Sequence, residues 1–149
     1  MDSRIIERLN RLGREIRVGF TGGRKAIQSE RITLEIVRIL YSLDYGISKV
    51  SHGGAVGADK IVHDTVLRIL PSTQVEIWPS NLTQYHAKLV VNENVTVHDQ
   101  KDPLERNKLI VDNSDLLVAI PDCKTEVLRS GTWQTIRYAK KTGVLVMII

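Results

Sequence analysis

Hydrophobic residues follow two alternating patterns along the chain, namely short apolar runs and longer stretches with an apolar residue at every third or fourth position. The short runs predict strands, which we place at 16–20, 47–51, 74–78, 94–97, 116–120 and 144–149. The longer repeat predicts amphipathic helices, which we place at 3–12, 29–43, 58–69, 83–91, from 102 onward, and at 133–141. The repeat is clearest in 29–43, where Ser29 is the expected N-cap, and weakest in 83–91.

Strands that alternate with helices at this spacing predict βαβ units and a mainly parallel sheet with helices on both faces. Burial on both faces would explain why 116–120 and 144–149 are apolar at every position. The length of 149 residues fits one ordinary domain. We therefore expect a single α/β domain over residues 1–149, with a helix inside 1–14 that precedes the first strand.

Composition narrows the class of protein. With 42% hydrophobic and 26% charged residues the chain is globular. No apolar run reaches the roughly 18–20 residues of a membrane span, and the start lacks a signal-peptide core. The single cysteine, Cys123, excludes an internal disulfide and a multi-cysteine zinc site, and it has no catalytic companion. His52 and His63 lack metal-ligand partners, so we expect a structural role for them and no metal or cofactor. From the single cysteine and the missing signal and membrane segments we expect a cytoplasmic protein without a membrane partner.

The charge balance points to an anionic small ligand. Lysine and arginine outnumber aspartate and glutamate by 21 to 17, a net charge of +4. A nucleic-acid binder usually clusters its basic residues and adds aromatic side chains for stacking. Here the basic residues are scattered and aromatic residues make up only 5% of the chain. We therefore expect a small anionic partner rather than nucleic acid.

Three glycine-containing segments fall at the edge where parallel strands end, which is where ligands bind in such sheets. Segments 21–25 and 53–59 follow the first two strands, and 130–132 precedes the last helix. Glycines there let the backbone approach a phosphate, and free N–H groups at a helix start favour an anion. The spacing in 53–59 is neither G-x-G-x-x-G nor a P-loop. Taken alone, 53–59 also fits a tight turn, 21–25 a solvated loop and 130–132 a plain N-cap. Because all three segments fall at the same edge of the sheet, we favour a shared ligand-binding site.

Two further polar residues, Arg106 and Asn107, lie in the first turns of a helix that is entered from the same edge. Asp102, Pro103 and Glu105 resemble a helix start, with aspartate as the cap, proline at the first position and glutamate at the third. We therefore expect Glu105 to complete a capping box with Asp102 rather than to act as a catalytic carboxylate.

Four motifs in order resemble one known group of proteins. They are V-G-F-T-G-G-R at 18–24, H-G-G-A-V-G-A-D at 52–59, P-L-E-R-N at 103–107 and S-G-T at 130–132. Together they resemble the SLOG superfamily of Smf/DprA and Lonely-Guy-related proteins, and within it the small YspA-like branch. The resemblance spans nearly the whole chain. It implies a Rossmann-like sheet that holds a nucleotide or nucleotide-derived ligand.

The resemblance also implies which residues bind the ligand. They come from the two glycine loops, from the Arg-Asn pair and from the start of the last helix. The expected ligand-binding residues are Thr21, Gly22, Gly23, Arg24, His52, Gly53, Gly54, Ala55, Gly57, Asp59, Arg106, Asn107, Ser130, Gly131 and Thr132.

The Lonely Guy enzymes carry the signature P-G-G-x-G-T-x-x-E, which would fall on 127–135 of this chain. Residues 127–129 are Val-Leu-Arg where that signature has Pro-Gly-Gly, and Thr135 stands in the place of the glutamate. The arginine of that family matches Arg106. The resemblance thus implies that a contact to phosphate or ribose is kept while the hydrolytic carboxylate is lost.

Cleavage of a glycosidic bond uses a carboxylate near the sugar, which Asp59 or Glu105 would have to supply. Asp59 begins a helix whose dipole is expected to keep it ionised and suited to a ribose hydroxyl.

The leading hypothesis is a module that senses or sequesters a nucleotide-like ligand, without turnover. The alternatives are an N-glycosidic hydrolase or transferase acting on nucleotides and, third, single-stranded DNA binding of the DprA type. The amphipathic first helix and the Lonely-Guy-like resemblance lead us to expect a homodimer or higher homo-oligomer.

Overall fold

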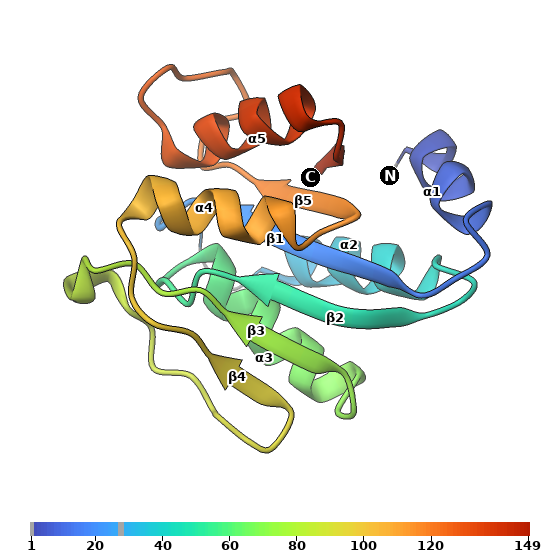
Figure 1. Ribbon diagram of the computed structural model, residues 1–149, viewed down its shortest axis with the longest axis horizontal. Coiled ribbons are helices and arrows are strands. Elements are labelled where there is room, and N and C mark those ends of the chain that lie inside the picture. The colour runs from blue at the N-terminus through green and yellow to red at the C-terminus, as the bar shows by residue number, and fades with distance from the viewer. Residues whose placement is uncertain (1, 27–28) are drawn as a thin grey trace.

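The computed structural model describes residues 2–26 and 29–149. Residues 1 and 27–28, which fall within the expected domain, lie outside the described part. The described chain contains the six strands β1 (Ile16–Gly22), β2 (Ile47–His52), β3 (Gln74–Ile77), β4 (Val95–Val97), β5 (Leu116–Ile120) and β6 (Leu145–Ile148). They form one sheet in the order β4-β3-β2-β1-β5-β6, and every neighbouring pair is parallel (Figure 1). The predicted α/β class is confirmed.

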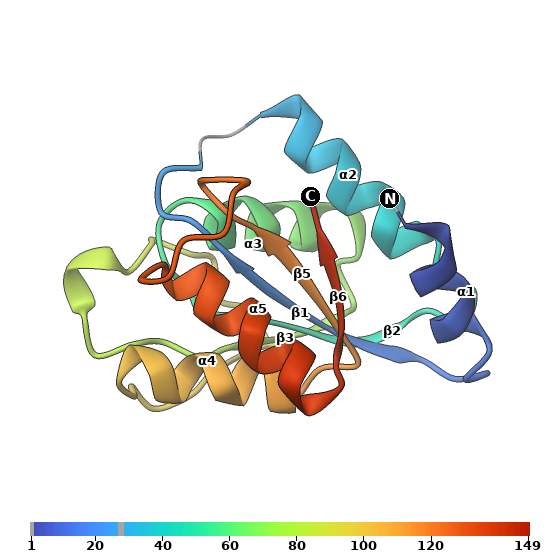
Figure 2. The same cartoon turned by 90° about the horizontal axis from the view of Figure 1, so that it is seen from above.

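Helices cover both faces of the sheet, as the alternation predicted. The helices are α1 (Ser3–Asn10), α2 (Glu30–Tyr41), α3 (Ala58–Ile69), α4 (Pro103–Asp112) and α5 (Gly131–Thr142). Figure 2 shows α2 and α3 on one side of the strands and α4 and α5 on the other. Within the described residues, no helix has both the length and the apolar character to cross a membrane.

The two continuous apolar runs differ in their surroundings. In β5 all five residues are buried, because β1 and β6 flank the strand and helices cover it. The second run forms β6, which is an edge strand, and Ile148 there is 42% exposed. Burial on both faces therefore explains β5, but the same explanation was wrong for β6, because a strand position at the edge is not visible in the apolar pattern.

Local capping signals set the helix starts. The Ser29 hydroxyl accepts a hydrogen bond from the N–H of Ile32 at 3.1 Å, which confirms the predicted cap of α2. Asp102 accepts from the N–H groups of Leu104 and Glu105, at 3.0 and 3.2 Å. The Glu105 side chain is exposed and makes no hydrogen bond within the described part of the chain. The capping box is therefore only half formed: Asp102 accepts from the first turn, but the Glu105 carboxylate does not return to the backbone N–H of Asp102 in the described part of the chain.

The predicted helix at 83–91 was wrong. Only the single 3₁₀ turn η1 (Thr83–Tyr85) forms there, and the rest of the segment is irregular. Its backbone bonds to the preceding glycine loop instead of to itself: the N–H of Val56 donates to the Tyr85 carbonyl at 2.8 Å, and the N–H of Ala87 donates to Gly54 at 2.9 Å. These tertiary hydrogen bonds replace the helical ladder, so a weak local propensity is overridden.

The first helix packs against its own chain. Ile6 and Leu9 of α1 are 6% and 1% exposed and belong to the core cluster that also contains residues of α2 and α3. Leu12 lies beyond the end of α1 and is exposed. The apolar stripe that motivated the expectation of self-association is thus largely used inside the domain, and the homo-oligomer stays a prediction.

Candidate functional site

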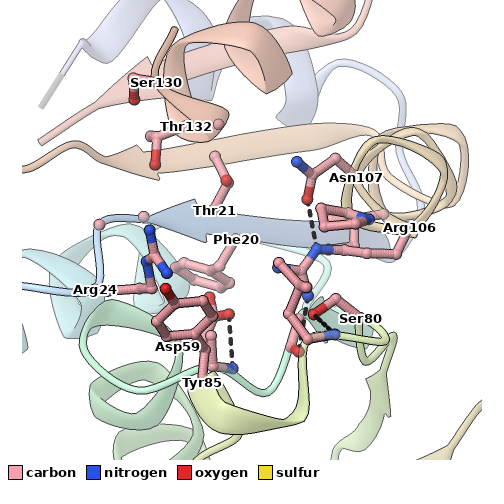
Figure 3. Close-up of a pocket in the computed structure, with 18 of the residues that line it drawn as sticks. Phe20, Thr21, Arg24, Asp59, Ser80, Tyr85, Arg106, Asn107, Ser130 and Thr132 are labelled. Atoms are coloured by element: carbon pink, nitrogen blue, oxygen red, sulfur yellow. Dashed lines mark hydrogen bonds between the residues drawn. The ribbon is translucent and has the colours of Figure 1, made fainter. Parts of the chain in front are cut away.

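A cavity of about 290 Å³ opens at the carboxyl ends of β1, β2 and β5 and beside the N-terminus of α5 (Figure 3). This volume lies at the lower end of the range of small-molecule sites. The lining residues are Phe20, Thr21, Gly22, Gly23, Arg24, Gly53, Ala55, Asp59, Ser80, Leu82, Tyr85, Pro103, Arg106, Asn107, Ile110, Asp122, Arg129, Ser130, Gly131 and Thr132. The three segments that the sequence placed at one edge therefore meet around one cavity.

Twelve of the fifteen expected ligand-binding residues line this cavity. The three that do not are His52, Gly54 and Gly57, and the candidate carboxylate Glu105 is also absent from the lining. Whether the twelve bind a ligand stays a prediction at this point. The structure brings them together, and it gives His52, Gly54 and Gly57 other surroundings.

Gly54 and Gly57 are needed for packing. Both have positive φ, +69° and +90°, where a side chain is strained. A Cβ on Gly54 would lie 2.7 Å from the Ile77 side chain, and one on Gly57 would lie 2.5 Å from the carbonyl oxygen of Gly23. These two glycines allow the second glycine loop to dock against β3 and the first loop, and the expectation that they approach a ligand stays a prediction.

His52 and His63 form a buried hydrogen-bonded chain, and both rings are fully buried. The N–H of Gly54 donates to His52 Nδ1 at 3.0 Å, so the proton of the neutral His52 ring is on Nε2. His52 Nε2 lies 2.9 Å from His63 Nδ1, and His63 Nε2 lies 2.7 Å from the Val90 carbonyl oxygen. Burial, helped by the charges near it, lowers the pKa of His52 to about 3. The expected structural role fits this arrangement.

Arg106 ties together the loops that follow β2 and β3. Its Nη1 donates to the carbonyl oxygens of Gly53 and Trp78, at 3.0 and 3.1 Å, and its Nε donates to Asn107 Oδ1 at 2.6 Å. Burial lowers the pKa of the guanidinium, and the facing Asp59 opposes this shift. An arginine stays charged even so, so Arg106 brings a fixed positive charge to the cavity wall.

Asp59 is almost fully buried, with 6% of the residue exposed. Its Oδ2 accepts from the N–H of Ala55 at 3.1 Å. Burial raises the pKa of Asp59, and this outweighs the opposing effects of Arg106 and of the backbone N–H donors of Ala55 and Gly53. The expectation that the helix dipole governs its ionisation is therefore corrected, because desolvation is the largest effect.

The N-terminus of α5 presents unused hydrogen-bond donors to the cavity. Ser130 caps the helix by accepting from the N–H of Trp133 at 3.4 Å, and its carbonyl accepts from Gln134 at 2.9 Å. Within the described ranges, the N–H groups of Gly131 and Thr132 have no hydrogen-bond partner. A Cβ built on Gly131 would meet nothing within 4 Å. Two free donors and open space thus lie at a positive helix end.

Thr135, which stands in the place of the Lonely Guy glutamate, does not line the cavity. It is 2% exposed, and its hydroxyl donates to the Gly131 carbonyl at 2.8 Å. No three His, Cys, Asp or Glu side chains gather as a metal site within residues 2–26 and 29–149. The carboxylates at the cavity wall are those of Asp59 and Asp122.

Sequence reasoning missed eight lining residues: Phe20, Ser80, Leu82, Tyr85, Pro103, Ile110, Asp122 and Arg129. The edge rule could have found Asp122, because it lies two residues after the strand 116–120. Tyr85 was hidden inside the helix that was wrongly predicted. The guanidinium carbon of Arg24 lies 3.7 Å from the centre of the Tyr85 ring, so these two residues meet at the cavity from loops far apart in the sequence.

No protein-family model matches the chain, and no curated protein matches it. Solved structures do resemble it. The structural-genomics protein TM1055 is 23% identical, with a TM-score of 0.63 over 88% of this chain and 72% of that one. DNA processing protein A from Helicobacter pylori, described with its single-stranded DNA binding mode, is 20% identical, with a TM-score of 0.62 over 99% and 68%. The Moco carrier protein from Chlamydomonas reinhardtii is 15% identical, with a TM-score of 0.55 over 91% and 76%.

These likenesses establish the Rossmann-like fold that the motifs implied. At these identities the likeness shows the fold alone.

Proposed function

We propose that the chain binds a nucleotide or nucleotide-derived ligand through its phosphate, as a sensing or sequestering module, and does not turn it over. We also propose that it belongs to the SLOG superfamily and to the small YspA-like branch. Four motifs in register and the shared fold support this assignment.

One observation carries the proposal. The free N–H groups of Gly131 and Thr132 line a cavity at the start of a 12-residue helix. Such a helix end attracts an anion, because its unpaired donors and the helix dipole both favour negative charge. Arg129, which also lines the cavity, lies two residues before Gly131 and adds a positive charge. A phosphate group is the ligand chemistry that this arrangement fits best.

The remaining polar groups suit a sugar. Asp59 and Asn107 line the cavity away from α5, and each carries an oxygen acceptor for a hydroxyl group. Arg106 already donates Nε and Nη1 to protein atoms, so we assign it chiefly to holding the loops and to balancing the charge of Asp59. Phosphate at α5 and ribose near Asp59 would use the two ends of the cavity.

Binding without turnover follows from the position of Thr135. The residue cannot ionise, is buried, and donates its hydroxyl to the backbone. The carboxylates left at the cavity wall are those of Asp59 and Asp122. Two backbone N–H groups together with Arg106 already interact with Asp59. The N–H of Lys25 donates to Asp122 at 3.3 Å. Glu105 does not reach the cavity. We therefore assign no carboxylate the role of the glycosidase acid.

The test uses two substitutions at one position. Gly131→Pro deletes one free N–H at the first helical residue, where proline is readily accommodated, and Ser130 before it is already extended, with φ −70° and ψ 129°. Gly131→Ala keeps the N–H and places its methyl group in open space. In calorimetry with AMP, Gly131→Ala should bind like the wild type, and Gly131→Pro should bind about 10- to 150-fold more weakly, since a charge-assisted hydrogen bond is lost.

Equal affinity of the two variants for AMP would contradict the assignment of phosphate to α5. Adenosine serves as the control ligand, because it lacks the phosphate and should not distinguish the proline variant from the alanine variant. Thermal unfolding of both variants without ligand checks that the proline leaves the fold intact.

Single-stranded DNA binding is the second candidate, favoured by the fold shared with DNA processing protein A. It differs from the first in its salt dependence, since a DNA strand contacts several phosphates and its affinity falls steeply with salt. A thymidine oligonucleotide titrated at two salt concentrations, with AMP as competitor, separates the two. Tight, salt-sensitive binding that AMP cannot displace would favour the DNA hypothesis.

A further inference from the structure

The aromatic ring of Tyr85 lies at the mouth of the cavity with a flat group already stacked on it. The Arg24 guanidinium carbon lies 3.7 Å above the ring centre, which is the separation of stacked planar groups (Figure 3). Arg24 belongs to the loop after β1, and Tyr85 ends the 3₁₀ turn η1 between β3 and β4. Tyr85 and Arg24 both line the cavity, so a planar group bound there would meet the tyrosine ring where the guanidinium now lies.

The loop that carries Tyr85 is firmly held. The Tyr85 carbonyl accepts from the N–H of Val56 at 2.8 Å, and Ala55 pairs with His86 as an isolated antiparallel bridge. His86 Nε2 lies 2.6 Å from the Ser80 carbonyl oxygen. A ring on such a loop is positioned before any ligand arrives, and this reduces the ordering cost of binding.

The partner now on the ring is loosely held by comparison. Arg24 is exposed, and in the part of the chain that the structure describes its side chain has no hydrogen bond or ion pair besides the stacking on Tyr85. An exposed cation–π contact is one of the weaker interactions in a protein. A ligand with its own planar group can therefore take this place while the arginine moves aside.

The surroundings of Tyr85 suit a base better than a sugar or a phosphate. Leu82, from the same loop, lines the cavity and is 40% exposed, and Ser80 lines it with a hydroxyl group. An aromatic ring, an aliphatic side chain and one hydroxyl match the flat face and the polar edge of a heterocycle. Figure 3 places Tyr85 and Arg24 away from Ser130 and Thr132, at the other side of the site.

We infer that the cavity contains a base subsite, in which Tyr85 stacks on the heterocycle of a mononucleotide in place of the Arg24 guanidinium. This inference rests on the proposed function, since the phosphate end of the same ligand is assigned to α5. It adds to the proposed phosphate site a second contact, by which the base of the nucleotide is recognised.

The test compares AMP with ribose 5-phosphate, which shares the phosphate and sugar but lacks the base. The wild type should bind AMP about 5- to 150-fold more tightly, the fold-change that corresponds to stacking one base on an aromatic ring. Tyr85→Leu should remove this preference and leave the affinity for ribose 5-phosphate unchanged. Tyr85→Phe is the matched control and should keep the preference, because it keeps the ring.

A second measurement uses the wild-type protein alone. Because Arg24 lies over the tyrosine ring, we expect the ring to shift the NMR signals of the Arg24 side chain. Saturating AMP should shift these signals toward ordinary values, and ribose 5-phosphate should not. Arg24 signals that stay unchanged in saturating AMP would overturn the inference even if Tyr85→Leu failed to fold.

The outcomes separate the two proposals. If ribose 5-phosphate and AMP bind equally well, the base subsite is wrong and the phosphate site stands. If neither binds, the proposed function fails and the base subsite with it. A thymidine oligonucleotide that displaces AMP and loses affinity in Tyr85→Leu would assign the same ring to single-stranded DNA and would overturn the mononucleotide assignment.

Discussion

The electrostatic coupling between Arg106 and Asp59 gives a prediction whose size follows from the structure. Both side chains flank Gly53, where a Cβ would lie 2.2 Å from Arg106 Nη1 and 3.0 Å from Asp59 Oδ2. Arg106→Ala deletes hydrogen bonds to Gly53, Trp78 and Asn107 and leaves the carboxyl group of Asp59 buried without its facing charge. We expect this variant to unfold more easily than the wild type.

The magnitude comes from two sources. Hydrogen bonds to a charged donor contribute about 1.5–3 kcal/mol each and are not additive. Removal of one partner of a buried ion pair costs about 3–5 kcal/mol, which is an upper limit here because Arg106 and Asp59 interact without a direct ion pair in the described part of the chain. Arg106 is only half-buried, so we take the lower end and expect a loss of about 3 kcal/mol in the free energy of unfolding. Asp59→Asn keeps an oxygen that accepts from Ala55 and should cost about 1 kcal/mol.

The assay is urea unfolding of four proteins: the wild type, the two single variants and the double variant. Because the neutral amide introduced by Asp59→Asn needs no positive partner, the double variant should be more stable than the sum of the single losses predicts, by about 1–2 kcal/mol. The cavity residue Arg24 is the matched control, since Arg24→Ala removes only an exposed stacking contact and should cost at most about 1 kcal/mol. Additivity of the double variant within about 0.5 kcal/mol would refute the coupling.

Three further predictions use other parts of the molecule. The pKa of His52 is lowered to about 3 in the folded chain, so as the pH falls this histidine is protonated first in the unfolded chain. The contribution of neutral His52 to the free energy of unfolding is therefore complete above about pH 6.5 and is lost as the pH falls toward 3. Across this window, the free energy of unfolding measured in urea should fall with pH more steeply in the wild type than in His52→Asn, by up to about 1.4 kcal/mol per pH unit. Equal slopes in the two proteins would contradict a buried, neutral His52. Chromatography of AMP incubated for hours with excess protein should show no free base; release beyond one equivalent, abolished by Asp59→Asn or Glu105→Gln, would promote the hydrolase hypothesis. Light scattering over a wide concentration range should give a dimer or larger mass, and a monomer throughout would dismiss self-association.

The positions of most strands and helices could be predicted from the sequence. The run 116–120 coincides with β5, and the helix 29–43 contains α2 together with its serine cap. These elements depend on short-range properties, namely apolar periodicity and the bonds of a capping side chain, which residues close in the sequence decide. The edge at which the site lies was equally predictable, because the carboxyl ends of parallel strands must meet at one edge.

The role of each glycine was decided only by the tertiary structure. The motif H-G-G-A-V-G-A-D presents Gly53, Gly54 and Gly57 alike, but Gly53 alone lines the cavity. Gly54 packs against Ile77, and Gly57 against Gly23 and the backbone of Arg24. These neighbours come from other strands and loops, so no local pattern shows which glycine faces a ligand and which faces the protein.

Contacts between distant parts of the sequence also explain why 83–91 is not a helix and why the pKa of Asp59 is raised. The segment 83–91 has helical spacing, but its backbone bonds to the distant glycine loop after β2, and this brings Tyr85 to the cavity. Asp59 stands at a helix start, where position alone favours the ionised form. Burial nevertheless raises its pKa, against the lowering effects of Arg106 and of the N–H groups of Ala55 and Gly53. Spacing along the chain determined where the polar groups are attached, and long-range packing decided their solvation and partners, because burial depends on atoms that meet only in the folded chain.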